Sequence, residues 1–185
     1  MPNETLSIIR SRRSIRKYTA QLVNDEDLRA ILDAAVYAPS AMNSQGWHFS
    51  VVRGAEMLAK VRAVMTQNML ASGVQRMVER ASVPGFVPFY NAPVLVILSA
   101  NPAYKFAQMD CGIAVQTIAL AAESLGLGSC IMVSTELLFA NDADGSLSRE
   151  LGFPSGYKHM VSICLGYKDE APDVKERKEG LVDCV

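Results

Sequence analysis

The stretch that decides the fold is YKFAQMDCGIAVQTIALAAESL, residues 104–125. It is rich in alanine and apolar all round, which is typical of a helix buried in a core or an interface. Gly126 and Gly128 follow it, so we expect the helix to end there and a strand to begin at Ser129. Because one chain of this size gives such a helix too little cover, the pattern also predicts a homodimer.

The chain on both sides of this stretch contains further helix and strand patterns. Asn24 is typical of an N-cap, with Asp27 at the third helical position, and this helix has to stop near Pro39. Five consecutive apolar residues at 94–98 indicate a strand covered on both faces. Residues 72–92 predict a mobile loop or short helices. The other predicted helices span residues 5–11, 55–71 and 147–151, and the other strands residues 47–52, 129–133 and 160–165.

The composition is ordinary for a globular protein. Half of the 185 residues are hydrophobic and a fifth are charged, and no repeat or linker divides them, so we expect one domain over residues 1–185. The formal net charge of −1 gives no general attraction for nucleic acid or a membrane surface. We find no pattern of a signal peptide, a membrane span or a disulfide scaffold. These features favour a cytoplasmic protein with buried, reduced thiols.

Several classes of catalytic site receive no support from the sequence. The only two histidines, His48 and His159, lie far apart and without a metal-ligand pattern, so no metal site is expected. Residues 126–131 lack the third glycine of a dinucleotide fingerprint and follow a helix instead of a strand. There is no P-loop, and residues 152–156 do not form a nucleophile elbow. Hydrolase and kinase activities are therefore not predicted.

Polar and basic residues gather at three places. The first is RRSIR, residues 12–16, whose guanidinium groups suit a phosphate, although such a cluster can also be a solvated surface. The second is APSAMNSQGW, residues 38–47, a run of small and amide residues that could line a flat polar ligand. The third is residues 175–177, where two cations would point the same way on an extended chain.

In this order, the motifs resemble those of the nitroreductase family of FMN-dependent oxidoreductases. Residues 12–16 resemble the family's opening basic motif, and residues 38–47 resemble its proline-serine-asparagine loop. AAESLGLGS, residues 121–129, resembles the end of its central helix, and LGY, residues 165–167, with the two tail cations resembles its closing strand and tail. The resemblance implies an α+β fold with a mainly antiparallel sheet wrapped by helices. It also implies an intertwined homodimer with FMN sites at the interface.

The resemblance further implies which residues contact FMN. One subunit would surround the cofactor with Arg12, Arg13, Ser14 and Arg16, joined at the phosphate by Lys175 and Arg177. The partner subunit would contribute Pro39, Ser40, Ala41, Asn43 and Gln45. Asn68 is the candidate for an amide near the pyrimidine ring, and the backbone at Val133 and Ser134 would pass the flavin.

The implied activity is transfer of two electrons from NADH or NADPH through flavin N5 to a small acceptor, by a ping-pong mechanism. The acceptor would be a nitroaromatic, a quinone, an enone or a free flavin, selected by residues 72–92. Because the cofactor performs the hydride chemistry, no catalytic side chain is expected; Arg16 would stabilise charge near flavin N1 and O2. Alternatives are a flavin-binding or storage protein, or a relative that performs reductive dehalogenation or oxidative flavin chemistry.

Overall fold

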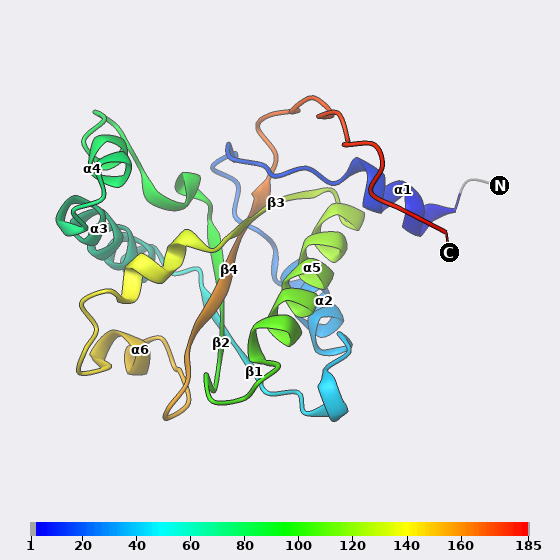
Figure 1. The fold of residues 1–185 in the computed structure, drawn as a ribbon. Coiled ribbons are helices and arrows are strands. Elements are labelled where there is room, and N and C mark those ends of the chain that lie inside the picture. The colour runs from blue at the N-terminus through cyan, green and yellow to red at the C-terminus, as the bar shows by residue number, and fades with distance from the viewer. Residues whose placement is uncertain (1–2, 185) are drawn as a thin grey trace.

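The computed structural model describes residues 3–184 as an α+β fold around one antiparallel sheet (Figure 1). The strand order is β1-β2-β4-β3, with β1 at Trp47–Val52, β2 at Val94–Ala100, β3 at Leu127–Met132 and β4 at Lys158–Tyr167. The α-helices are α1 Glu4–Ser11, α2 Asp25–Val36, α3 Ala55–Ala71, α4 Gln75–Ala81, α5 Ala107–Ser124 and α6 Ser146–Glu150, and the 3-10 helices are η1 Ala41–Asn43, η2 Pro88–Asn91 and η3 Ser134–Phe139. The predicted class, a mainly antiparallel sheet wrapped by helices, is confirmed.

Strand β2 lies inside the sheet and is buried along its whole length. Val94, Val96 and Leu98 face the core that contains α2 and α5, whereas Leu95 and Ile97 face the core that contains α3. Successive side chains of a strand point to opposite faces, so a strand covered on both sides needs continuous apolar sequence. The prediction drawn from these five residues is confirmed.

Helix α5 is buried on one side only by its own chain. Ala114, Ile118 and Ala122 are fully buried against the sheet. On the opposite side, Met109 and Ile113 are 64% and 37% exposed. The outer face of this apolar helix is therefore left without cover in one subunit.

Helix α5 begins at Ala107, later than residue 104, because residues 102–106 form turns. Residues 72–92 form the short helices α4 and η2, one of the two predicted alternatives. Helix α4 contains no buried residue, and neither its N-cap Val74 nor the N-cap of η2 makes a side-chain capping bond. Among residues 3–184, no helix is both long and apolar enough to cross a membrane.

Gly126 and Gly128 have different roles, which corrects the expectation that both end α5. Gly126 ends the helix with a φ of +77°, in the left-handed region that favours glycine. Gly128 lies inside β3. A Cβ atom at Gly128 would lie 2.9 Å from Ile15 Cγ2 and from Lys168 Cγ, so the strand needs a glycine here for close approach of these chains.

The sheet and α5 share two ends. The loop end comprises the start of α5, the end of β2 and the start of β4, next to η1 and the loop around it, residues 38–46. The basic end comprises the end of α5, the start of β3 and the end of β4. The N-terminal segment and the C-terminal tail lie side by side at the basic end (Figure 1).

Candidate functional site

Ile15 holds residues 12–16, the basic segment, against the sheet. Its side chain is 2% exposed, and its backbone N–H donates to the Ser129 carbonyl of β3 at 2.8 Å. Gly128 makes room for this side chain. Because Ile15 is fixed in the core and neighbours on an extended chain point to opposite sides, Ser14 and Arg16 point away from the core.

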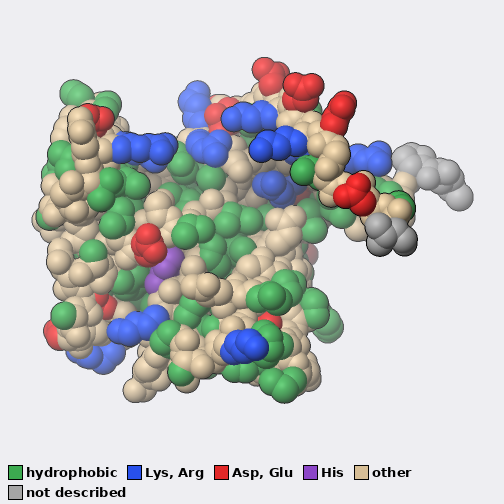
Figure 2. Space-filling view, viewed as in Figure 1, with side chains coloured by type: hydrophobic (Ala, Val, Ile, Leu, Met, Phe, Trp, Pro, Cys, Tyr) green, Lys and Arg blue, Asp and Glu red, His purple; other side chains and the backbone are tan. Residues whose placement is uncertain are grey.

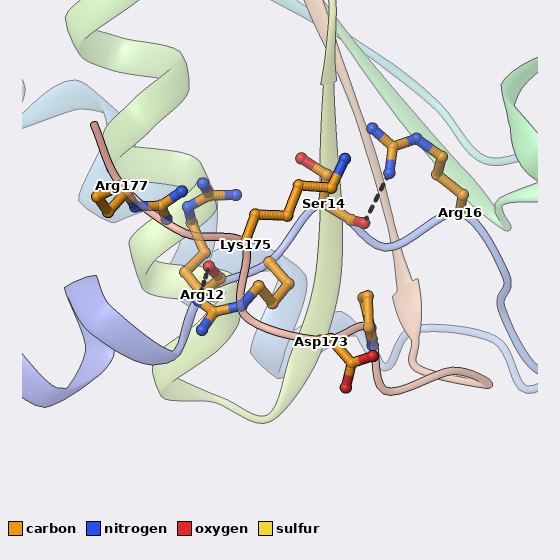
Figure 3. Close-up of a pocket in the computed structure, with 8 residues that line it drawn as sticks. Arg12, Ser14, Arg16, Asp173, Lys175 and Arg177 are labelled. Carbon is orange, nitrogen blue, oxygen red and sulfur yellow. Dashed lines mark hydrogen bonds between the residues drawn. The ribbon is translucent and has the colours of Figure 1, made fainter.

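Five cations line one cavity at the basic end. The lining consists of Arg12, Arg13, Ser14 and Arg16 from the N-terminal segment and Pro172, Asp173, Lys175 and Arg177 from the tail. Figure 3 shows the tail bringing Lys175 and Arg177 to Arg12, and Figure 2 shows Lys and Arg side chains gathered along this edge of the molecule. The structure thus brings together all six residues that were predicted at the two ends of the sequence.

Within residues 3–184, none of these five cations forms an ion pair. Arg13 donates instead to the backbone carbonyls of Arg10 and Arg12, at 2.6 and 2.8 Å. Arg16 donates to the carbonyl of Ser14 at 3.2 Å. Guanidinium groups without a carboxylate partner are suited to a bound anion, and their planar forks fit a phosphate.

Arg16 and Cys130 show how positive charge is concentrated at the basic end. Burial lowers the pKa of Arg16, but contact with Tyr90 and the nearby Glu170 carboxylate outweigh it, so the pKa lies above its usual value. Burial raises the pKa of the Cys130 thiol, while the charges of Arg16 and Arg12 oppose that shift. The thiol is protonated at neutral pH, and the guanidinium group of Arg16 is charged.

The loop end is built around the buried carboxylate of Asp110. Its Oδ1 accepts from the backbone N–H of Ala41 at 3.1 Å, and its side chain is 3% exposed. The Tyr104 hydroxyl donates to the Ala41 carbonyl at 3.0 Å. Met42 and Asn43 have φ values of +54° and +52°, which L-residues rarely adopt. Such backbone persists only where surrounding contacts hold it, and Asp110 supplies them.

The other predicted loop residues bond to one another. The Ser40 hydroxyl accepts from the backbone N–H of Gln45 at 3.0 Å, and the Gln45 amide donates to Asn43 Oδ1 at 3.1 Å. Pro39 is exposed, and Ala41 is half-buried. These contacts fold the loop into a defined shape that faces away from its own chain.

The two groups of predicted site residues do not meet in one chain. Asp110 binds the loop near the start of α5, and Glu123 accepts a hydrogen bond from Ser11 near its end. At 1.5 Å per residue, the helix between these two carboxylates is about 20 Å long. A site that uses both groups therefore needs residues from a second subunit.

Asn68, the candidate for an amide near the pyrimidine ring, does not line the basic cavity. It is buried in α3, where its amide nitrogen donates to the carbonyls of Leu137 and Leu138 at 2.8 and 3.2 Å. Its Oδ1 accepts from Asn141 at 2.7 Å. With its polar atoms satisfied in this way, Asn68 ties α3 to η3 and the segment after it.

The predicted backbone contacts at Val133 and Ser134 lie where β3 passes into η3. Val133 is 63% exposed. Ser134 lines a small second cavity, together with residues of α3, α4 and η2. These two residues are therefore available to a ligand placed over the end of β3.

Neither histidine is arranged for metal binding, and no group of three potential metal ligands occurs within residues 3–184. His159 Nε2 lies 2.8 Å from the Thr135 hydroxyl and 3.1 Å from the Ser162 hydroxyl, and its ring stacks on Phe139. Burial lowers the pKa of His159 to about 4. At neutral pH it is an uncharged, half-buried and hydrogen-bonded side chain.

Sequence reasoning placed Tyr90 in the segment expected to select the acceptor, but it did not predict that Arg16 and Arg80 approach the Tyr90 ring. The guanidinium carbons of Arg16 and Arg80 lie 6.0 and 5.7 Å from the centroid of the Tyr90 ring. Only the density of aromatic residues in 72–92 pointed to this segment. The approach of residues 16, 80 and 90 depends on tertiary packing, which no local pattern signals.

Comparison with known proteins agrees with this architecture. The sequence profile of the nitroreductase family matches residues 9–167. A nitroreductase with bound FMN from Bacteroides fragilis is 34% identical, with a TM-score of 0.90 and 99% of each chain covered. A nitroreductase with bound FMN from Desulfitobacterium hafniense is 35% identical, with a TM-score of 0.89 and complete coverage of both chains. The NADPH-flavin oxidoreductase of Vibrio harveyi is 30% identical over 95% of this chain and 70% of its own.

The profile covers most of the chain, and the relatives share its whole fold. The chain belongs to the nitroreductase family.

Proposed function

We propose that this protein is an oxidoreductase that binds FMN and transfers two electrons from NADH or NADPH to a small acceptor. The observation that carries the proposal is the cavity in which five cations from the two ends of the chain converge, none of them in an ion pair within residues 3–184. The FMN-bound relatives described above support the identity of the cofactor.

The residues at the basic end fit FMN. Its phosphate is a dianion, and a chain of net charge −1 can attract it only through a local cluster of cations. In this proposal one subunit holds the cofactor with Arg12, Arg13, Ser14, Arg16, Lys175 and Arg177, with the backbone of Val133 and Ser134 beside it. The partner subunit supplies Pro39, Ser40, Ala41, Asn43 and Gln45.

The chemistry supplied by the bound group is acceptance of a hydride from NAD(P)H at N5 and delivery of two electrons to the acceptor. Reductant and acceptor use the same face in turn, so we expect ping-pong kinetics. Candidate acceptors are nitroaromatics, quinones, enones and free flavin. For a nitroaromatic, one NAD(P)H and one proton convert the nitro group to a nitroso group and water. Arg16 keeps its positive charge throughout, because an arginine guanidinium group stays protonated in proteins.

A homodimer is part of the same proposal. Large apolar side chains are exposed along α1, the end of α2, η1 and α5: Leu6, Ile9, Val36, Tyr37, Met42, Met109 and Ile113. An exposed apolar surface of this extent is typical of an interface. The two groups of site residues lie about 20 Å apart along α5 in one chain. A second copy that covers the apolar surface would bring its own loop next to the cations of the first chain.

The direct test is to identify the flavin that the purified protein contains. We expect a yellow protein that releases about one FMN per chain on denaturation, from one site per subunit, and that consumes NAD(P)H steadily with menadione. Extraction of FAD, or of no flavin after reconstitution with FMN, contradicts the cofactor assignment. Flavin retention without turnover identifies a storage protein instead.

Sedimentation tests the assembly. The FMN-loaded protein should sediment as a dimer at micromolar concentration, and Ile113→Glu, which places a charge on the exposed face of α5, should shift it toward monomer. A stable, FMN-loaded monomer of the unaltered chain contradicts the homodimer and the shared site.

A further inference from the structure

A fully buried threonine closes the turn that follows β3. The Thr135 side chain is 0% exposed, and its hydroxyl donates at 2.9 Å to the carbonyl of Met132, the last residue of β3. The same hydroxyl lies 2.8 Å from His159 Nε2. Because a hydroxyl has only one proton and Met132 receives it, the Thr135 oxygen accepts its second hydrogen bond from the N–H at His159 Nε2. We call these three bonded residues the turn clamp.

A β-bulge aims His159 at this turn. The register between β2 and β4 shifts between Leu98 and Ser99, so that β4 carries one extra residue, Met160. In a regular strand, residues 159 and 162 would point to opposite faces. The extra residue brings both to one face, where His159 Nε2 lies 3.1 Å from the Ser162 hydroxyl. Bulges that re-aim a side chain in this way are over-represented next to active sites.

Aromatic contacts fix the plane of the His159 ring. It stacks on Phe139 of η3, with ring centroids 5.4 Å apart and planes at 27°. Phe139 in turn contacts the buried Phe153, whose ring centroid lies 5.2 Å away. His159 is uncharged at neutral pH, because burial lowers its pKa to about 4. Its ring therefore has a single N–H, which the stack directs at Thr135.

The turn clamp leaves two residues between its ends. Val133 and Ser134 separate the buried residues Met132 and Thr135, and Val133 is exposed. The Glu136 N–H donates to the Val133 carbonyl at 3.1 Å, which closes the turn from the other side. The backbone direction of these two residues thus depends on the hydrogen bonds of Thr135.

We propose that His159 is a positioning residue of the flavin site. Acting through Thr135, it sets the direction in which the backbone of Val133 and Ser134 meets the flavin ring. The inference rests on the proposed function, in which these two residues lie beside FMN, and it adds a residue that acts without touching the cofactor. Polar groups whose direction is fixed in advance need not reorganise when the charge of a bound group changes.

The test removes the same hydrogen bond from either end. His159→Phe keeps a ring that can stack on Phe139 but has no N–H, and Thr135→Val keeps the shape of the side chain but has no hydroxyl. Each variant should weaken the binding of FMN and of riboflavin by the same factor, about 2- to 10-fold, the range for one neutral hydrogen bond. Equal factors are expected because the turn meets the ring and not the phosphate.

The midpoint potential of the bound flavin separates positioning from a general loss of stability. In both variants the ratio of the affinities for reduced and oxidised FMN should change by about three- to tenfold, which is about 15 to 30 mV for two electrons. A contact that only stabilises the fold weakens both forms alike and leaves this potential unchanged. Combining the two substitutions should shift the potential no further than Thr135→Val alone, because both remove one shared interaction.

Conservative variants and a matched histidine complete the test. His159→Gln retains an N–H donor near the place of Nε2 and should restore most of the potential, as should Thr135→Ser, which retains the hydroxyl. The control is His48→Phe, the same exchange at a half-buried histidine of β1, a strand that β2 separates from β4. His48 Nδ1 lies 3.5 Å from the Ser50 hydroxyl. His48→Phe should therefore leave the potential unchanged.

An unchanged potential in folded, FMN-loaded His159→Phe or Thr135→Val overturns the inference, as does an equal shift in His48→Phe. Weakening of FMN without weakening of riboflavin also overturns it, because the effect would then lie at the phosphate. Circular dichroism checks the fold of each variant. If His159→Phe does not fold, Thr135→Val and its rescue by Thr135→Ser decide.

The unaltered protein tests the proposed function separately. If it binds no FMN, the proposed function fails and the inference fails with it. If it retains FMN and consumes NAD(P)H with menadione while the variants keep its potential, only the role of His159 is contradicted.

Discussion

The basic end and the loop end of α5 are built in different ways. At the basic end, backbone pairing at Ile15 holds a segment whose cations have no ion-pair partners in residues 3–184. At the loop end, the carboxylate of Asp110 is satisfied by the Ala41 N–H and the Ser44 hydroxyl. The cations of the basic end are thus available to a ligand, whereas the carboxylate of Asp110 stabilises the loop. This difference supports the proposal that one chain supplies two unlike halves of a site shared between subunits.

Filling the space that Gly128 leaves for Ile15 should have the largest effect on the basic end. In Gly128→Val the new side chain would meet Ile15 and Lys168 at about 2.9 Å, and overpacking of this kind costs about 3 kcal/mol at the upper end. Valine favours strands, so the loss is steric. We expect lower stability to denaturant and loss of FMN, because Ile15 carries Arg16 with it.

Gly54→Ala is the control for Gly128→Val, because a Cβ atom at Gly54 meets nothing within 4 Å. Equal stability of both variants would show that β3 and the basic segment are not in close contact.

Acid should act on the loop end of the sheet, where His159 stands at the start of β4. Burial lowers the pKa of His159 from 6.5 to about 4. As pH falls from 6.5 to 4, the unfolded chain binds a proton that the folded chain does not, so unfolding becomes more favourable. The stabilisation is complete above pH 6.5 and is lost as pH falls to 4, by on the order of 3 kcal/mol.

Urea unfolding at a series of pH values measures this effect. In His159→Gln, the free energy of unfolding should fall between pH 6.5 and 4 by on the order of 3 kcal/mol less than in the unaltered protein. An unchanged slope would place the acid sensitivity elsewhere.

Removing the Arg177 cation should weaken FMN binding at the basic end without affecting the loop end. Arg177→Ala should raise the Kd for FMN by roughly 10- to 100-fold, the range for one charge-assisted hydrogen bond. Riboflavin lacks the phosphate, so its affinity should be nearly the same for both proteins. Fluorescence titration measures both values. Equal weakening of riboflavin would assign the tail to folding or dimer contacts.

The smallest change concerns the carboxylate at the loop end. Asp110→Asn keeps an acceptor for the Ala41 N–H but removes the charge, so we expect a loss of about 1 kcal/mol in stability. If the loop serves the partner's site, the FMN affinity of the dimer should fall as well, although the basic end is unaltered. Unchanged FMN binding with a loosened loop would argue against that shared role.

The sequence predicted most of the fold because periodicity reports burial. Strand β1 and helix α3 begin and end at the predicted residues, Trp47–Val52 and Ala55–Ala71. Helix α4 was left open as a loop or a helix, since it buries no residue and lacks a side-chain cap. Sequence periodicity cannot identify a helix that has no buried face.

The candidate site was predicted in part, for a similar reason. Clustered charge is visible in a sequence, so Arg12 and Arg177 could be named before their meeting was known. The partners of Asn68 are backbone carbonyls of η3, which a sequence cannot reveal. The contacts of Arg80 with Phe86 and Tyr90 were missed because tertiary packing creates them and no motif signals them.

The attachment of Ile15 to Ser129 has a consequence for solubility. Strand β3 is the last strand of the sheet, and an uncovered apolar edge can pair with the same edge of another molecule and aggregate. The segment that carries the cations covers part of this edge, through the bridge between Ser14 and Ser129. A chain that lacks residues 1–16 would therefore lose the arginines of the basic segment. It would also expose part of the edge of β3, which favours aggregation.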